Sequence, residues 1–315
     1  DSFSKSVQLG QGLEQTGKLS RASMARTINA MWVCRQKLQR HNVTNIRLVA
    51  TEACRRARNS QHFVQQVKRE TGLTLEIIQP EEEARLAVIS CAPLVSTKTE
   101  QLLVVDIGGG STELVWIDLS HVPKRERPRA IMRLHAGFRQ DPGPLAAAKV
   151  VDWISVPLGV ATLRDQFADV EDDSARFALM SWFFEENLEA FAPSTAEQSR
   201  ENFQIVGTSG TVTTVAASHL GLRRYDRTKV DGLRMTTDQI DAVIHGYLKL
   251  GEAGRKADPR IGEDRQALIM SGAAILQTLM RLWPTDQLSV ADRGLREGLL
   301  YQQMSADGVL EDAPY

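Results

Sequence analysis

The segment Leu102–Asp118, LLVVDIGGGSTELVWID, places three consecutive glycines between two runs of apolar and β-branched residues. Each glycine loses more chain entropy on folding than any other residue, so a glycine triplet needs a structural reason. The flanking runs predict two strands joined by a tight turn, and the bare N–H groups of such a turn can surround a phosphate. The alternative is an ordinary hairpin, although simple hairpins usually turn with Asn-Gly or Gly-X.

The residues around this turn do not match two other glycine-rich phosphate loops. A dinucleotide fingerprint needs G-x-G-x-x-G opening a helix, and a Walker loop needs G-K-[ST]. Hydroxyl and amide groups can hold phosphate oxygens, while carboxylates hold Mg²⁺ directly or through water. The candidate phosphate-binding residues are Gly108, Gly109, Gly110, Ser111 and Thr112, and the candidate metal-binding carboxylates are Asp106 and Glu113.

A second glycine loop, VGTSGT at Val206–Thr211, lies between a predicted strand and a predicted helix. The first turn of a helix favours an anion through its free amides and its dipole. Serine or threonine at a helix start is also a routine cap, so this loop alone leaves both interpretations open. Its candidate phosphate-binding residues are Gly207, Ser209, Gly210 and Thr211.

Two further segments carry charged candidates. The segment PEEEARL predicts a helix that begins at Pro80, and Glu83 is either part of an ordinary acidic helix start or a carboxylate that activates water. The segment TEACRRARN follows a predicted strand, and Arg55 belongs either to a solvated turn or to a phosphate clamp. A phosphatase with a cysteine nucleophile has an arginine six residues after that cysteine. Position 60 is Ser60, so Cys54 does not fit this pattern and we interpret it as a packing residue.

Length and charge limit the remaining possibilities. The 315 residues, 42% of them hydrophobic, suffice for two domains, and we place the boundary in the polar segment 91–101, giving domains 1–96 and 97–315. A net charge of −1 argues against a dedicated nucleic-acid binder. No apolar run is long enough to span a bilayer, so no membrane association is expected. Three widely spaced cysteines suit a reducing, cytoplasmic location.

Helical and strand-like segments alternate along the chain, which predicts an α/β fold. Helices are expected near residues 22–39, 62–72, 80–90 and 175–191, and in three more segments after residue 236. A polar turn is expected after the strand 46–51, and a strand around residues 129–137.

Taken together, these segments resemble the exopolyphosphatase and guanosine pentaphosphatase (Ppx/GppA) family, a branch of the actin-like ATPase superfamily. The similar segments occur in family order over nearly the whole chain: LVATEACRRARN, EEEARL, DIGGGSTELV, SVPLG, VGTSGT and RGLREGLLY. The resemblance implies two actin-like, ribonuclease H-like α/β domains with the active site in a cleft between them, and a last helix, about 296–306, that packs back on the first domain.

The resemblance also implies roles for the candidate residues. Glu83 is similar to the family's general base, and Arg55 to its phosphate-contacting arginine. Glu113 matches the carboxylate that organises the metal ion, Mg²⁺ or Mn²⁺, with Asp106 beside it. The implied reaction is hydrolysis of a terminal phosphoanhydride of inorganic polyphosphate or of the 5′-phosphate of pppGpp. A homodimer is implied as well.

Two other functions stay open at this point: an alarmone- or polyphosphate-binding regulatory protein, and an actin-like small-molecule kinase. Two departures from the family pattern bear on them. Family members begin with a strand and a D-x-G-S-N-S type loop, the first phosphate loop of the superfamily, and the sequence shown has no such segment. A protein that began at Asp1 would lack this part of the phosphate site and the first strand of a sheet, and is therefore expected to have weak activity and poor stability. The stretch 135–153 is longer and richer in proline than the family pattern.

Overall fold

The computed structural model describes residues 3, 5–136, 138, 147–191, 193 and 202–310. Helices and strands alternate, as predicted for an α/β protein, and the chain divides into two compact units, Asp1–Pro80 and Glu81–Tyr315. The domain boundary near residue 96 stays a prediction. In the stretch 135–153 that departs from the family pattern, residues 137 and 139–146 lie outside the described residues.

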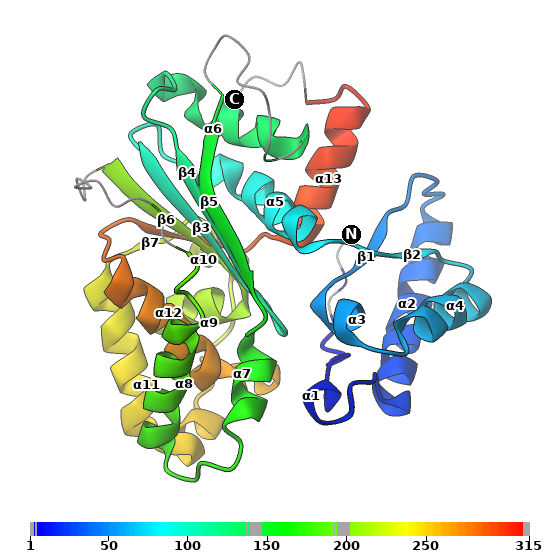
Figure 1. Cartoon of the computed structure of the whole chain (residues 1–315), viewed down its shortest axis with the longest axis horizontal. Coiled ribbons are helices and arrows are strands. Elements are labelled where there is room, and N and C mark those ends of the chain that lie inside the picture. The colour runs from blue at the N-terminus through cyan, green and yellow to red at the C-terminus, as the bar shows by residue number, and fades with distance from the viewer. Residues whose placement is uncertain are drawn as a thin grey trace. The chain divides into compact units, whose positions relative to one another are not determined.

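The unit Asp1–Pro80 contains a two-stranded parallel sheet with helices packed around it (Figure 1). Its core is formed by apolar residues of both long helices, including Met24, Ile28, Phe63 and Val67. The α4 helix ends at Gly72, whose φ of 71° is the left-handed conformation predicted for a C-cap glycine. The elements are α1 (Leu13–Thr16), α2 (Arg21–Arg40), β1 (Leu48–Ala50), α3 (Glu52–Arg56), α4 (Ser60–Thr71) and β2 (Leu75–Ile77).

The unit Glu81–Tyr315 is built around a six-stranded mixed sheet of order β5-β4-β3-β6-β8-β7. The predicted glycine hairpin is confirmed, because β3 and β4 pair antiparallel, and β6 and β8 continue the sheet parallel to β3. The strands are β3 (Gln101–Ile107), β4 (Thr112–Asp118), β5 (Lys149–Val156), β6 (Phe203–Thr208), β7 (Arg234–Met235) and β8 (Leu288–Ala291).

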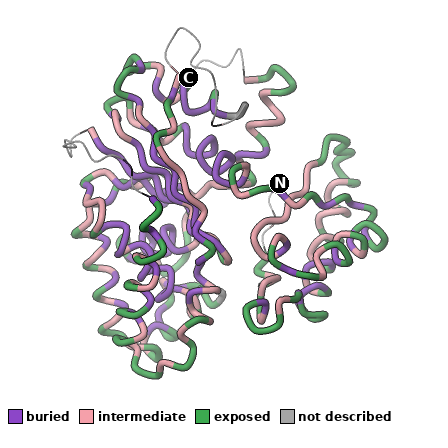
Figure 2. Tube along the Cα trace, in the orientation of Figure 1, coloured by how far each residue is buried: buried purple, intermediate pink, exposed green. Residues whose placement is uncertain are grey.

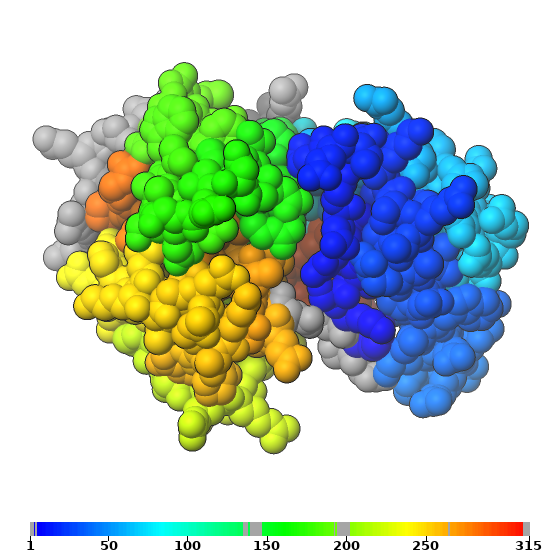
Figure 3. Space-filling view, turned by 90° about the horizontal axis from the view of Figure 1, so that it is seen from below, coloured from blue at the N-terminus to red at the C-terminus, as the bar shows by residue number. Residues whose placement is uncertain are grey.

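Helices cover both faces of this sheet (Figure 1). One layer contains α7 (Val160–Gln166), α8 (Asp173–Glu186), α9 (Gly210–His219), α11 (Thr237–Ala257) and α12 (Ile269–Leu282). The other contains α5 (Pro80–Cys91), α6 (Arg127–Met132) and α13 (Leu295–Ala306). The sheet and α12 are the most deeply buried parts of the unit (Figure 2), and Figure 3 shows the first layer from outside, with α8 in green beside α11 in yellow.

The two faces of β3 explain how one strand serves a core and a polar site. Leu103, Val105 and Ile107 pack into the large core with α9 and α12. Successive side chains of a strand point to opposite faces, so Leu102, Val104 and Asp106 share the other face, where α5 lies. The alternation therefore places the Asp106 carboxylate on the α5 face.

Two local predictions were wrong. The segment after β1 is not a polar turn but begins with the helix α3 (Glu52–Arg56). Glu52 and Arg55 form an ion pair across one turn of this helix, which stabilises it. The predicted strand at 129–137 is helical instead, in α6 and the 3₁₀ helix Arg133–Ala136. Pro128 sits in the first turn, and the buried Ala130, Ile131 and Leu134 have helical rather than alternating spacing.

Candidate active site in the sheet unit

The carboxylates Asp106 and Glu113 face each other across the β3–β4 hairpin. They are direct register partners, and opposite residues of an antiparallel pair project from the same face with Cβ atoms about 5 Å apart. Glu113 is only 2% exposed, and Ser155 of β5 donates a hydrogen bond of 2.8 Å to its Oε1 atom. The hairpin thus holds two carboxylates side by side in a mostly buried position.

Glu83 joins this pair from the first turn of α5. Its side chain is 8% exposed and close enough to act electrostatically on both carboxyl groups. Burial and then the charge of Glu83 raise the pKa of Asp106 to about 7. The pKa of Glu113 is also raised well above its usual range, first by burial and then by Glu83 and Asp106. Three predicted site residues therefore form one acidic cluster.

The position of α5 is fixed by close packing of its backbone. A Cβ atom at Gly298 of α13 would lie 2.2 Å from the Leu86 carbonyl oxygen, so the two helices touch backbone to backbone at this point. Only glycine allows such an approach. The predicted packing of the last helix on the first domain stays a prediction, but α13 does contact the helix that carries Glu83.

The glycine turn is supported from behind by the start of α7. The N–H groups of Val160 and Ala161 each donate a 2.9 Å hydrogen bond, to the carbonyl oxygens of Gly108 and Gly109 respectively. A Cβ atom at Gly159 would lie 2.4 Å from the Gly108 oxygen and 2.6 Å from the Gly110 nitrogen. The backbone of the turn therefore packs directly on the start of α7, and this contact requires a glycine at position 159 because any Cβ atom there would clash with the turn.

This support fixes the direction of the turn's N–H groups. In a trans peptide the N–H points opposite to the preceding C=O, and no peptide bond here is cis. Because the carbonyls of Gly108 and Gly109 point toward α7, the N–H groups of Gly109 and Gly110 point away from it. A Cβ atom at Gly109 would meet nothing within 4 Å, so the space in front of that residue is open.

The second glycine loop lies next to the acidic cluster because β6 pairs with β3. Thr208 is the register partner of Asp106, and the loop continues into α9. The Ser209 hydroxyl accepts hydrogen bonds of 3.1 Å from the N–H groups of Thr211 and Val212, so it is a helix cap. The N–H groups of Thr211 and Val212 are therefore already hydrogen-bonded to this cap. The Thr211 side chain packs against Gly272 of α12.

Arg265, which no sequence pattern indicated, lies over this loop. A Cβ atom at Gly210 would stand 2.0 Å from Cζ of Arg265, so the guanidinium group rests directly on the glycine backbone. Arg265 is exposed, and among the described side chains no carboxylate pairs with it. It sits 55 positions after Gly210, at the end of the short 3₁₀ helix Glu263–Arg265, and no local pattern links the two. Ser155 was missed as well, although the segment SVPLG that contains it was noted.

Arg55 belongs to the other compact unit, Asp1–Pro80. Its guanidinium group donates to Glu52 Oε2 at 2.9 and 3.1 Å and to the carbonyl oxygen of Ile78 at 2.9 Å. Its role in phosphate binding stays a prediction. Cys54, in the same helix, is 1% exposed, and burial raises the pKa of its thiol to about 11, in agreement with a packing role.

The donor atoms around the acidic cluster are oxygens, the ligands that Mg²⁺ prefers. Among the described residues, no group of three or more His, Cys, Asp or Glu side chains is placed to hold a metal ion. Mg²⁺, however, usually keeps several waters and binds through one or two carboxylates. The opposed pair Asp106 and Glu113 fits that mode of binding.

Comparison with known proteins identifies the relatives of this chain. The model of the Ppx/GppA phosphatase family matches residues 2–307. The chain is 27% identical over 303 residues to a guanosine-5′-triphosphate,3′-diphosphate pyrophosphatase of Aeromonas salmonicida. That alignment covers 94% of this chain and 52% of the relative, so the chain spans about half the length of that protein.

Two solved structures are similar over almost the whole chain. The Ppx/GppA family member of Aquifex aeolicus is 28% identical with a TM-score of 0.71, over 96% of this chain and 87% of that one. An exopolyphosphatase-like protein is 25% identical with a TM-score of 0.80, over 96% and 90%. The fold is thus the actin-like α/β fold that the resemblance implied. Among the described residues, no helix is long and apolar enough to cross a membrane. The chain belongs to the Ppx/GppA phosphatase family.

Proposed function

We propose that this protein is a Mg²⁺-dependent phosphohydrolase that removes the terminal phosphate from a linear phosphoanhydride. Its substrate is inorganic polyphosphate, the 5′-phosphate of pppGpp, or both. The names of the relatives support this class of reaction, since they include a guanosine-5′-triphosphate,3′-diphosphate pyrophosphatase and an exopolyphosphatase-like protein.

One observation carries the proposal: the acidic cluster and the glycine turn are parts of the same hairpin. Glu113 follows the turn directly, Asp106 precedes it, and Glu83 lies close to both. The N–H groups of Gly109 and Gly110 point away from α7, and a Cβ atom at Gly109 would meet nothing within 4 Å. Anion-binding amides beside a cluster of carboxylates are what a phosphate and a divalent cation need together.

In the proposed reaction, Glu83 takes a proton from a water molecule aligned with the terminal phosphorus. The amides of the glycine turn, together with Arg265, which lies over the second loop, hold the oxygens of the phosphoryl group that is transferred. Attack by water needs no covalent nucleophile. The two buried thiols fit this, because burial raises the pKa of Cys54 to about 11 and that of Cys91 to about 12.

Asp106 and Glu113 are the residues that would hold Mg²⁺. The bound ion would neutralise charge on the phosphate oxygens during the displacement. The folded chain disfavours ionisation of both carboxyl groups: burial and then the charge of Glu83 raise the pKa of Asp106, and burial, Glu83 and Asp106 raise the pKa of Glu113. A cation bound between Asp106 and Glu113 would favour their ionised forms.

The test is phosphate release in the presence of Mg²⁺, measured in parallel with long-chain polyphosphate and pppGpp. Replacing Glu83→Gln keeps the size of the side chain and removes the base, so release should fall by about 10²–10⁴-fold. Glu81→Gln is the matched control, because Glu81 lies in the same turn of α5 but is exposed. It should retain the wild-type rate.

The outcomes separate the alternatives. Equal activity of Glu83→Gln and wild type would exclude Glu83 as the base. Tight binding of pppGpp without any phosphate release by the wild type would favour a regulatory binding protein. ATP-dependent phosphorylation of an acceptor would instead identify a kinase.

A further inference from the structure

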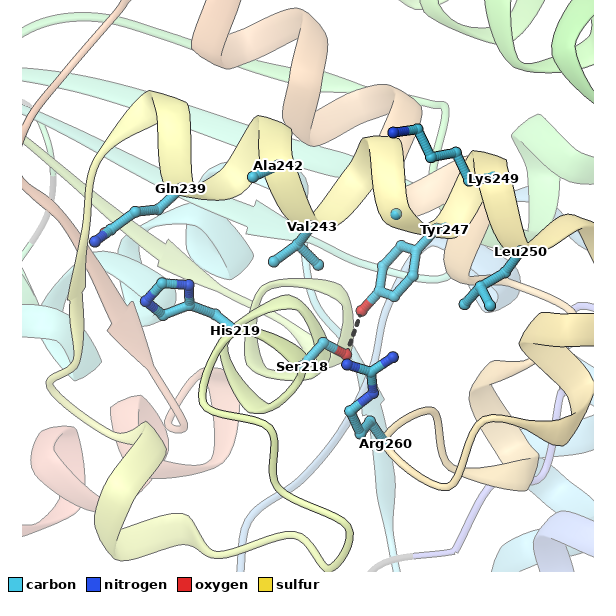
Figure 4. A pocket seen from close by; sticks show the side chains of 10 residues that line it. Ser218, His219, Gln239, Ala242, Val243, Tyr247, Lys249, Leu250 and Arg260 are labelled. Atoms are coloured by element: carbon cyan, nitrogen blue, oxygen red, sulfur yellow. Dashed lines mark hydrogen bonds between the residues drawn. The ribbon is translucent and has the colours of Figure 1, made fainter.

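The helical layer of the unit Glu81–Tyr315 contains a pocket of about 450 Å³ between α9 and α11 (Figure 4). Two of its polar groups are bonded within the protein, because the Tyr247 hydroxyl donates a hydrogen bond of 2.6 Å to Ser218 and Arg260 pairs with Asp258. The charge of Arg260 is thus already compensated. The outer face of α8, in the same layer (Figure 3), is different, because its exposed residues form a regular pattern.

The exposed face of α8 is apolar, whereas the outer face of a surface helix is normally polar. Its stripe contains four exposed apolar residues at helical spacing: Ala175, Ala178, Leu179 and Trp182. Leu179 is 38% exposed and Trp182 is 55% exposed. In the described segment 168–190, the exposed charged residues are all acidic, among them Glu171 before the stripe and Glu186 after it. The stripe is therefore apolar in the middle and acidic at both ends.

The α2 helix, in the unit Asp1–Pro80, carries a stripe of the opposite charge. No Asp or Glu occurs between Glu14 and Glu52, whereas seven Lys and Arg residues do. The exposed face of α2 also contains four apolar residues: Ala22, Ala25, Trp32 and Val33. Trp32 is 41% exposed, and Cζ of Arg35 lies 5.9 Å from the centre of its ring, a cation–π contact that holds the ring in place.

The two stripes have the same spacing of small and large residues. Trp32 follows Ala25 by seven residues and Trp182 follows Ala175 by seven residues, about 10.5 Å along each helix. If the two helices pack antiparallel, one register places each tryptophan against the alanine of the other helix. A large side chain then meets a small one at both points, as the packing of ridges into grooves requires.

The charges at the ends of the stripes fit the same register. Arg21, the first residue of α2, lies four positions before Ala25, and Glu186, the last residue of α8, lies four positions after Trp182. Both are exposed, and the antiparallel register brings them opposite each other. Opposite charges across a contact speed association and fix the register.

We propose that α2 of one copy of this chain packs antiparallel on α8 of a second copy, with Trp32 against Ala175 and Trp182 against Ala25. The charges favour this pairing over contacts between like helices. Two α8 helices would bring acidic ends together, and two α2 helices would bring basic side chains together. The surface is separate from the phosphohydrolase site, since it shares no residue with the acidic cluster or the glycine turn.

The measurement is sedimentation velocity of the whole chain at several concentrations. The wild type should associate as its concentration rises, and more weakly at high salt. Trp32→Ala and Trp182→Ala should each raise the dissociation constant about tenfold, because buried tryptophans dominate such contacts. Leu300→Ala is the matched control, since Leu300 is 56% exposed on α13 and belongs to neither stripe. It should associate as the wild type does.

Mixing the two tryptophan variants tests that unlike helices meet. An equimolar mixture should associate more tightly than either variant alone, because α2 of Trp182→Ala and α8 of Trp32→Ala are both intact. The register is tested by charge exchange. Arg21→Glu and Glu186→Arg should each weaken association about fivefold, while the double variant should return to within about twofold of the wild type.

Three outcomes would overturn the proposal. A wild type that stays monomeric at about 100 μM would exclude the contact at any useful affinity. Normal association of either tryptophan variant would mean that its helix does not take part. A double charge variant no better than the single ones would exclude the register. Thermal unfolding of each variant shows that it is folded.

Discussion

The two glycine loops use the same residue types but present positive charge in different ways. In the turn Gly108–Ser111, the start of α7 engages the carbonyl groups, and this directs backbone N–H groups outward. In the loop Gly207–Thr211, the Ser209 hydroxyl caps the first amides of α9, and the Arg265 guanidinium group lies over Gly210. One loop therefore offers backbone dipoles and the other a side-chain cation from a distant segment. A glycine-rich motif does not by itself tell which of the two devices is present.

The largest expected effect is a loss of stability when the packing of α7 on the first glycine loop is disturbed. Gly159→Ala would place a Cβ atom 2.4–2.6 Å from the backbone of the glycine turn, and backbone cannot move aside as a side-chain end can. We expect the free energy of unfolding to fall by about 3 kcal/mol or more, measured by urea denaturation. A loss below about 0.5 kcal/mol would contradict the close packing of α7 on the turn.

The next effect concerns Asp106, which lies between the two loops. Its pKa is raised to about 7 when folded, so the folded protein keeps a proton that the unfolded chain releases above about pH 4. Without metal, stability should therefore fall by about 3 kcal/mol as the pH rises from about 4 to about 7. The measurement is urea unfolding against pH in EDTA.

Asp106→Asn is the control for that pH dependence. The amide cannot ionise, so the fall in stability should be smaller in this variant. Added Mg²⁺ should restore wild-type stability near neutral pH, because a ligand that binds only the folded state stabilises it. An unchanged pH profile in Asp106→Asn would rule out Asp106 as the titrating group.

Gly109→Ala tests the open side of the first loop. A Cβ atom there meets nothing within 4 Å, so stability should change by less than about 1 kcal/mol. The added methyl group enters the space proposed for phosphate, so the KM for polyphosphate or pppGpp should rise about tenfold, about 1.4 kcal/mol. Unchanged kinetics in a stable variant would mean that the turn is an ordinary hairpin.

The smallest effect is expected at the second loop. Arg265→Gln removes the guanidinium group above Gly210, and solvent screens the charge of an exposed side chain. The KM should rise about threefold, about 0.7 kcal/mol, with little change in thermal stability. Arg296→Gln is the matched control, because its side chain is 62% exposed and belongs to α13. Equal effects of the two variants would show that Arg265 acts only through general charge.

Much of the fold followed from local patterns. The hairpin around the glycine triplet, the helix beginning at Pro80 and the Gly72 cap were all predicted, because strand alternation, helix starts and left-handed caps are encoded within a few residues. The segment 129–137 was mispredicted as a strand because its short apolar run fits either period.

The sequence alone identified the family and the chemical types of the candidate residues: Glu83, Asp106 and Glu113 as carboxylates, and two glycine loops. Only the tertiary structure decided which of them meet and what they offer. The pairing of Asp106 with Glu113 depends on strand register, the direction of the turn's amides on hydrogen bonds from α7, and the place of Arg265 on a contact across 55 positions. Such contacts depend on packing between distant segments, which no window of neighbouring residues contains.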